Sequence, residues 1–182
     1  SLKGSIVIEV QYLLRTLKDL TFDNIYHEHY NYWSLTSLNY FFNKLNVKIY
    51  RAEIINTHGG SIRIYITKNK LVKVEKNVKN ILNNEEKFGL KNIKTYRKFS
   101  NKVKTIKKNV SSNIKKISKK YKKIIFYGAP AKATTALNFY SIKNRRMIII
   151  EDNKLKQGKI LPGVQIPIFP KDMLKKNKAE LI

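Results

Sequence analysis

An apolar strand, a turn of small residues, a helix and a second strand follow one another in the last third of the sequence, and few folds accommodate that order. The predicted ranges are 123–127 for the first strand, 128–130 for the turn, 131–140 for the helix and 147–150 for the second strand. The second strand ends at the acidic pair Glu151 and Asp152. This order is typical of the opening of a doubly wound α/β fold, in which parallel strands alternate with helices.

The first 67 residues predict further strands and one helix. Residues 5–10 predict a strand buried on both faces, as in a parallel sheet, and a polar, aromatic linker follows it. Ser34 is the predicted N-cap of a helix whose apolar residues recur at helical spacing as far as Leu45. Residues 47–55 and 61–67 predict two strands joined by a short link, which indicates an antiparallel hairpin.

Residues 70–121 predict helices rich in lysine. Apolar residues recur every three or four positions from Ile93 to Tyr121, lysines fill the other positions, and Gly89 is expected to separate two helices. Near the end of the chain, Pro170 suits the first turn of a last helix.

The charge of the chain is concentrated in this helical part. The 182 residues carry a net charge of +26, of which residues 68–123 contribute +17 and residues 1–67 only +2. A strongly basic balance suggests nucleic-acid binding. Only six of the 38 basic residues are arginine, however, and arginine is the usual choice for bidentate contacts to phosphates and bases. A solvated lysine face is therefore the favoured interpretation.

The segment Tyr26-His27-Glu28-His29 places two of the three histidines of the chain beside a carboxylate and a tyrosine. Imidazole accepts a proton near neutral pH, a neighbouring carboxylate can orient it, and a tyrosine hydroxyl can hydrogen-bond a developing oxyanion. This chemistry favours a proton-transfer site. The alternatives are a linker whose histidines only cap or pack, and a metal pair, for which the His-x-His spacing alone is weak evidence.

Three loops carry candidate binding residues. The Gly128–Lys132 turn opens a helix, where backbone N–H groups and the Lys132 ammonium favour an anion, although a plain tight turn is the alternative. The Asp152–Gly163 loop follows the next strand, so both segments are expected at the carboxyl ends of neighbouring strands, where open α/β sheets bind ligands. His58 precedes two glycines in the hairpin link, and either faces a site or is simply exposed.

Taken together, these segments resemble the sugar C-methyltransferase family over nearly the whole chain. The motifs that carry the resemblance are Ile8-Glu9-Val10, Phe22 to His29, Thr57 to Arg63, Tyr127 to Lys132, Lys156-Gln157-Gly158, Leu161-Pro162-Gly163 and Ile166-Pro167-Ile168. The resemblance implies an α/β protein in three parts. These are the last strands of a class I S-adenosylmethionine (SAM) methyltransferase sheet in 1–67, a lysine-rich helical connector in 68–122, and an incomplete Rossmann-like C-terminal domain in 123–182.

In that family, a 4-keto sugar linked to a nucleotide loses the proton beside its carbonyl, and the enolate takes the methyl group of SAM. The resemblance implies His29 as the general base, with Glu28 and Tyr26 as its companions in the active site. The expected substrate-binding residues are His27, His58, Tyr127, Gly128, Ala129, Lys132, Asp152, Lys156 and Gln157. We expect the Gly128–Lys132 turn and the Asp152–Gly163 loop to form one wall of the nucleotide-sugar site, across a cleft from Tyr26–His29.

The resemblance also implies that both cofactor sites of the family lie upstream of this chain, which we expect to be a piece of a longer protein. The glycine-rich loop for SAM and the cysteine-rich zinc segment are missing, so we expect no metal site here and no activity of the piece alone. No apolar run reaches the roughly 18 residues of a membrane span. The expected location is the cytoplasm, and the expected partner is a nucleotide-linked keto sugar, not nucleic acid or a membrane. A basic nucleic-acid-binding module and a non-catalytic gene remnant remain as alternatives.

Overall fold

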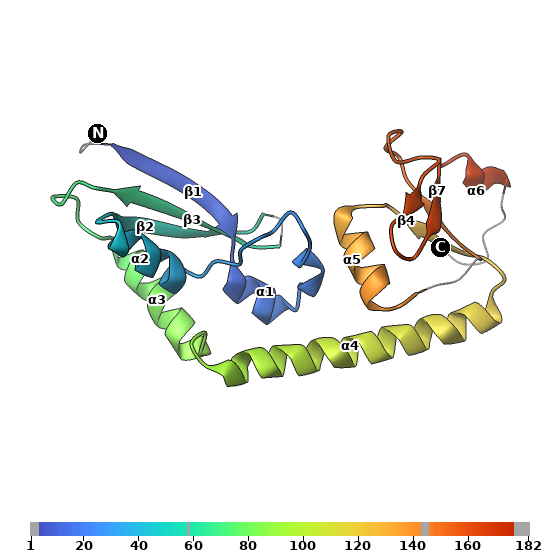
Figure 1. Cartoon of the computed structure of the whole chain (residues 1–182), viewed down its shortest axis with the longest axis horizontal. Coiled ribbons are helices and arrows are strands. Elements are labelled where there is room, and N and C mark those ends of the chain that lie inside the picture. Colours follow the sequence, from blue (N-terminus) through green and yellow to red (C-terminus); the bar gives the residue numbers. More distant parts are fainter. Residues whose placement is uncertain (1–3, 58, 143–145, 177–182) are drawn as a thin grey trace. The chain divides into compact units, whose positions relative to one another are not determined.

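The computed structural model describes residues 4–57, 59–142 and 146–176, and the chain divides into two compact units. The first unit comprises Ser1–Phe22 and His27–Lys102, and the second comprises Asp23–Tyr26 and Val103–Ile182. The long helix α4 (Ile93–Lys120) begins in the first unit and ends in the second (Figure 1). The predicted α/β class is confirmed, because each unit combines a sheet with helices.

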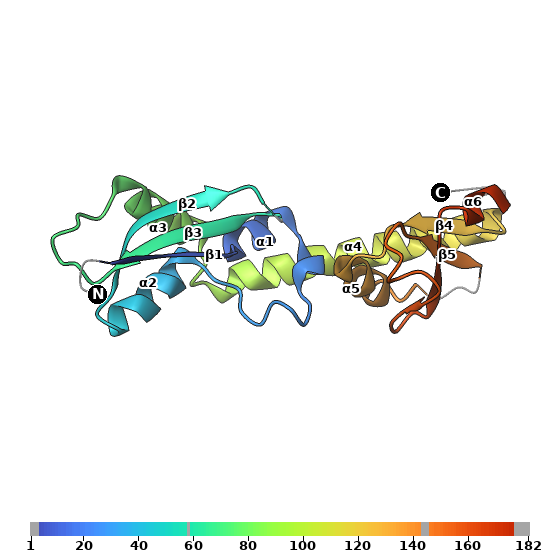
Figure 2. The same cartoon turned by 90° about the horizontal axis from the view of Figure 1, so that it is seen from above.

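The first unit is built on a three-stranded antiparallel sheet in the order β1-β3-β2. Its strands are β1 (Ser5–Gln11), β2 (Lys48–Ile55) and β3 (Ser61–Thr67), and the pairing of β2 with β3 confirms the predicted hairpin. Helices α1 (Leu13–Asp19), α2 (Leu35–Lys44) and α3 (Lys76–Phe88) lie on one face of the sheet (Figures 1 and 2). Their apolar residues pack with alternate residues of β3 in one buried core.

Two predictions for this unit are wrong. The strand β1 is neither parallel nor buried on both faces, because it pairs antiparallel with β3 at the edge of the described sheet, with Ile6 62% and Val7 53% exposed. A short apolar run fits a covered strand and an edge strand equally well. The predicted linker contains α1 and a 3-10 helix at Phe22–Asn24. The helix α1 has only seven residues, too few to show a clear helical period among polar neighbours.

The start of α2 is fixed by a cap and by a buried carboxylate. Ser34 caps the helix as predicted, since its hydroxyl accepts the N–H of Ser37 at 3.0 Å. The N–H groups of Leu35 and Thr36 donate to Glu85 of α3 at 2.6 and 2.8 Å, and the Thr36 hydroxyl donates to the same group at 2.6 Å. A negative charge is favourable at a helix N-terminus. Glu85, which is fully buried, therefore ties α3 to the point at which α2 begins.

Helices α3 and α4 are rich in lysine. Gly89 ends α3 in the left-handed conformation, with φ 82°, and separates it from α4 as predicted. Val78, Ile81 and Val103 are buried, whereas most of the lysines on the two helices are exposed. Among the described residues, no helix is long and apolar enough to cross a membrane.

The second unit contains a four-stranded sheet in the order β4-β5-β7-β6. Its strands are β4 (Ile124–Tyr127), β5 (Met147–Ile150), β6 (Ile160–Leu161) and β7 (Ile166–Phe169). β4, β5 and β7 are parallel, and β6 pairs antiparallel with β7. Helix α5 (Ala131–Phe139) connects β4 to β5, which confirms the predicted strand–turn–helix–strand order.

Strand β5 is buried along its whole length, because helices cover both faces of this second sheet. Apolar residues of α4 and α5 pack with one set of its side chains, and α6 (Met173–Lys176) packs with the other. The prediction for Pro170 is wrong in detail. Pro170 precedes α6, and its carbonyl accepts the N–H of Met173 at 3.0 Å.

Candidate functional site

A surface hollow of about 490 Å³ lies in the first unit, where β1 ends and β3 begins. The loop before α2 contributes Glu28, His29, Tyr30, Asn31 and Trp33, and the strands contribute Glu9, Val10, Gln11 and Ser61. Hollows of this size accommodate small ligands. The structure therefore places the predicted base and its neighbouring carboxylate in one concave site.

The loop that carries His29 is anchored where it enters α2. The carbonyl of Trp33 accepts the N–H of Leu13 at 2.9 Å, and Trp33 forms a bridge with the fully buried Tyr12. His29 itself is half-buried, and its ring centroid lies 6.5 Å from that of Tyr32. Tyr12 directly follows β1, so this anchor holds the loop beside the end of that strand.

The other residues predicted with His29 are placed differently. His27 is exposed and is not among the residues that line the hollow. Tyr26 is half-buried and is grouped with the second unit. His58 lies outside the described residues. Within the first unit, the structure thus brings together Glu28 and His29 of the predicted set.

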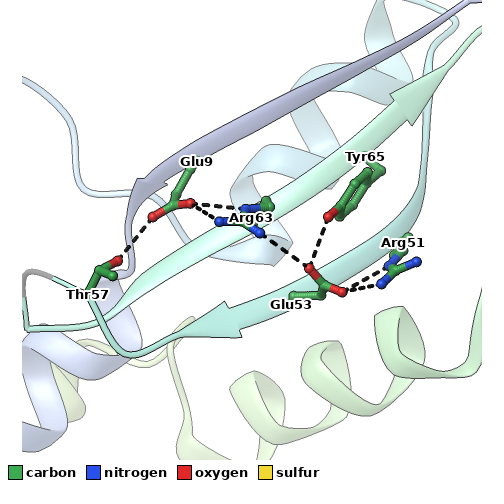
Figure 3. A network of polar contacts seen from close by, with 6 residues as sticks. All are labelled: Glu9, Arg51, Glu53, Thr57, Arg63 and Tyr65. Atoms are coloured by element: carbon green, nitrogen blue, oxygen red, sulfur yellow. Dashed lines mark hydrogen bonds and ion pairs between the residues drawn. The ribbon is translucent and has the colours of Figure 1, made fainter.

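Glu9 also lines this hollow, although the sequence did not single it out as a site residue. Arg63 donates to one carboxylate oxygen from Nε at 3.0 Å and from Nη2 at 2.8 Å, and the Thr57 hydroxyl donates to the other at 3.1 Å (Figure 3). The hydrogen bonds from Arg63, and then that from Thr57, lower the pKa of Glu9. A carboxylate that stays ionised at neutral pH therefore lines the same hollow as His29.

The network around Glu9 continues across the sheet (Figure 3). Arg63 is paired in register with Glu9 on one side and with Glu53 on the other, and its Nη1 lies 3.9 Å from a carboxylate oxygen of Glu53. Tyr65 and Arg51 also donate to Glu53, each with a bond of 3.0 Å. Cross-strand pairing brings these opposite charges together. The contacts among these charged residues follow from the pairing register, which is a property of the folded sheet.

In the second unit, the Gly128–Lys132 turn lies beside the loop that follows β5. Tyr127 and Ile150, the last residues of β4 and β5, are paired in register. Glu151 accepts the N–H of Ala129 at 2.7 Å and that of Asn153 at 3.0 Å. Lys156 donates to the carbonyl of Ala129 at 2.8 Å. These bonds hold the turn and the loop together at one edge of the sheet.

Several predicted binding groups in this region are already engaged within the protein. The N–H of Gly128 donates to the carbonyl of Ile150 at 2.7 Å. The Tyr127 hydroxyl donates to Asp152 at 2.6 Å, and the Gln157 amide donates to the carbonyl of Glu151 at 2.8 Å. Since the N–H groups of Gly128 and Ala129 already donate hydrogen bonds within the protein, binding of an anion at this edge depends on Lys132 and on the start of α5.

Titration of Glu151 tests the hydrogen bonds that hold the turn and the loop together at this edge of the sheet. The N–H groups of Asn153 and then Ala129 lower the pKa of Glu151 below its ordinary value of 4.5. Because the pKa of Glu151 is lowered in the folded state, its hydrogen bonds stabilise the fold at pH values above 4.5. This stabilisation is lost as the pH falls through the lowered pKa. We expect the NMR shift of the Ala129 amide proton to change with pH with a midpoint below 4.5.

A Glu151→Gln variant is the control for that titration, because its side chain does not ionise. Its Ala129 amide should show no transition in the same range. A midpoint at or above 4.5 in the unmodified chain would contradict the assigned hydrogen bonds.

Comparison with known proteins identifies the family of the chain. A family model for the C-methyltransferase C-terminal domain matches residues 56–182, and the chain therefore belongs to this family of C-methyltransferases. The chain is also 32% identical over 168 residues to the C-methyltransferase NovU of Streptomyces niveus. That match covers 91% of this chain and 40% of NovU, so the chain spans less than half the length of this relative. The family predicted from the sequence is confirmed.

Proposed function

We propose that this chain is the carboxyl-terminal part of a SAM-dependent C-methyltransferase that acts on a nucleotide-linked 4-keto sugar. One observation carries the proposal: His29 lines a hollow together with the carboxylates Glu9 and Glu28, in a chain of the C-methyltransferase family. Methylation at carbon requires a carbanion, and a base of suitable pKa forms one most easily beside a carbonyl. The name of NovU states C-methyltransferase activity for that relative.

In the proposed reaction, an imidazole nitrogen of His29 takes the proton from the carbon beside the sugar carbonyl. The electron pair of the broken C–H bond moves into an enolate, and His29 holds the abstracted proton in a hollow that Glu28 also lines. SAM, when bound, supplies the electrophilic methyl group. Transfer of that methyl group to the enolate carbon would leave the electron pair of the methyl–sulfur bond on sulfur, and the residues of the hollow would hold the reacting carbon for it.

The lining of the hollow fits a cationic cofactor nearby. It contains the carboxylates of Glu9, which is paired with Arg63, and of Glu28, which is exposed, and no lysine or arginine is among its described lining residues. A sulfonium ion is favoured in such surroundings, since opposite charges attract. The loop that would bind the rest of SAM is still expected upstream, as is the zinc site. Within the described part of the chain, no group of three or more histidine or acidic side chains is arranged to hold a metal.

The first unit also supports a methyltransferase sheet that continues beyond the described strands. β1 lies at the sheet edge with two exposed β-branched residues, Ile6 and Val7. An edge strand of this kind offers unpaired backbone groups to a further strand. This agrees with the proposal that residues 1–67 provide the last strands of a class I SAM-methyltransferase sheet.

The function is tested in the complete enzyme with SAM and a nucleoside-diphosphate-linked 4-keto sugar. Methylated sugar and S-adenosylhomocysteine should form in equal amounts. Failure to methylate a range of such sugars, by a folded protein that binds SAM, would contradict the proposed substrate class.

Lys132 is proposed to contact the diphosphate of the substrate. Lys132 is the second residue of α5, and a helix N-terminus also favours an anion. We expect Lys132→Ala to weaken nucleotide-sugar binding about tenfold, which corresponds to about 1.4 kcal/mol. Calorimetry on the complete enzyme measures this effect. The matched control is Lys122→Ala, an exposed lysine before the other end of β4, and equal losses in both variants would contradict a specific contact.

A further inference from the structure

A second hollow, here called the α4 hollow, lies within the second unit and has no part in the proposed reaction. Its volume is about 520 Å³, and it is bounded by the carboxyl-terminal half of α4, the segment after α5 and the first residue of β5. Ile142 and Met147 are almost fully buried and form its deep part, beside Ile114. The hydroxyl of Ser111 donates to the carbonyl of Tyr140 at 2.8 Å and holds α4 against the end of α5 at this place.

Lysines form the outer part of the α4 hollow. Lys107, Lys115 and Lys119 line it, and they lie on one side of α4 because their spacing follows the helical repeat. The ammonium of Lys107 lies 4.9 Å from the centre of the ring of Phe139, the residue before the lining residue Tyr140. No acidic residue is among the described residues that line it, and the sequence has none between Lys87 and Ile150. Burial, and then the negative charge of Asp23, raise the pKa of Tyr140, which lines the hollow, so one carboxylate lies near the three lysines and the local charge stays positive.

The α4 hollow is separate from the proposed nucleotide-sugar loops. Met147 begins β5 and is paired with Ile124 at the start of β4. The Gly128–Lys132 turn follows Tyr127, at the other end of the same strand. Two ligands could therefore bind this unit independently, one at each end of the sheet.

We infer that the α4 hollow binds a small anion that carries an apolar ring, of the kind that a nucleotide presents. The apolar deep part would exclude water from a flat ring, and the three ammonium groups would hold phosphates at the edge. A free phosphate would leave the apolar part unused, and a neutral ring would not need the lysines. The volume is in the range of small-ligand sites, and lysine binds phosphate as a point charge without strict geometry.

The test is calorimetric titration of the intact chain with ATP, inorganic triphosphate and adenosine at 0.15 M salt, where interactions between exposed charges are largely screened. We expect ATP to bind at least about tenfold more tightly than either of the other two. The double variant Lys115→Ala/Lys119→Ala should weaken ATP binding by about tenfold or more. The matched control, Lys116→Ala/Lys120→Ala, removes the same charge from the same helix outside the hollow and should change it by less than about twofold.

In the complete enzyme, Lys115→Ala/Lys119→Ala should leave nucleotide-sugar binding unchanged, which separates this site from the proposed sugar site and from any failure of the proposed function. Equal losses in the two double variants would overturn the inference, as would ATP binding no tighter than triphosphate, or no ATP binding at all. Displacement of ATP by duplex DNA, with a steep dependence on salt, would also overturn it and would identify a general polyanion surface.

Discussion

We expect that replacing His29 with alanine in the complete enzyme will lower the rate of methyl transfer by about 10²- to 10⁴-fold, the range that a positioned general base contributes, because His29 is the proposed base. The half-buried imidazole lines the hollow with Glu9 and Glu28, and no other histidine is among its described lining residues. Binding of SAM should persist, since the loop expected to bind it lies elsewhere. Steady-state kinetics with labelled SAM measures the loss in kcat.

A second measurement separates a missing base from a disturbed fold. In deuterated water without SAM, the unmodified enzyme should exchange the proton beside the sugar carbonyl, and His29→Ala should not. Circular dichroism of the two proteins should coincide. Near-normal turnover or exchange in the variant would remove His29 from the mechanism.

Glu85→Ala is expected to lower the free energy of unfolding by about 2–4 kcal/mol, the largest stability effect predicted for this chain. The substitution removes the acceptor for two backbone N–H groups and one hydroxyl at the start of α2, all at 2.6–2.8 Å. It also leaves a cavity, because the side chain is fully buried. Urea unfolding should show a lower midpoint with an unchanged slope.

The matched control is Glu86→Ala, which removes the same charge from the next, exposed position of α3. It should change the stability by less than about 0.5 kcal/mol. Equal effects of the two substitutions would contradict the role assigned to the buried hydrogen bonds. Since the loop that carries His29 leads into α2, Glu85→Ala should also raise the KM for the sugar in the complete enzyme.

Several elements were predictable because the information for them lies within short stretches of sequence. Ser34 and the spacing of Leu35 and Leu38 predicted α2, and the structure shows the cap and both buried leucines. The small-residue turn between two β-branched runs predicted the order β4, α5, β5. Gly89 predicted the break between α3 and α4, since glycine readily adopts the left-handed conformation found there.

The residues around the hollow could be predicted only in part. Glu28 and His29 stand out as a local cluster of titratable side chains. Glu9 is 20 positions away from His29, and it joins the site because β1 ends beside the loop. Arg63 holds Glu9 through the pairing of β1 with β3. Neither relation has a signal at short range in the sequence.

The sequence by itself determined the family and most of the elements, and it predicted the loop that carries His29 as the site of chemistry, because helical and strand periodicity, caps and motifs are local properties. Only the tertiary structure decided that β1 is an antiparallel edge strand, that Glu85 supports α2, and that Glu9 shares a hollow with His29. It also showed that Glu151 already occupies an N–H group of the predicted anion-binding turn. Each of these contacts joins groups that are far apart in the sequence. Strand register and the burial of apolar surface bring such groups together, and both exist only in the folded chain.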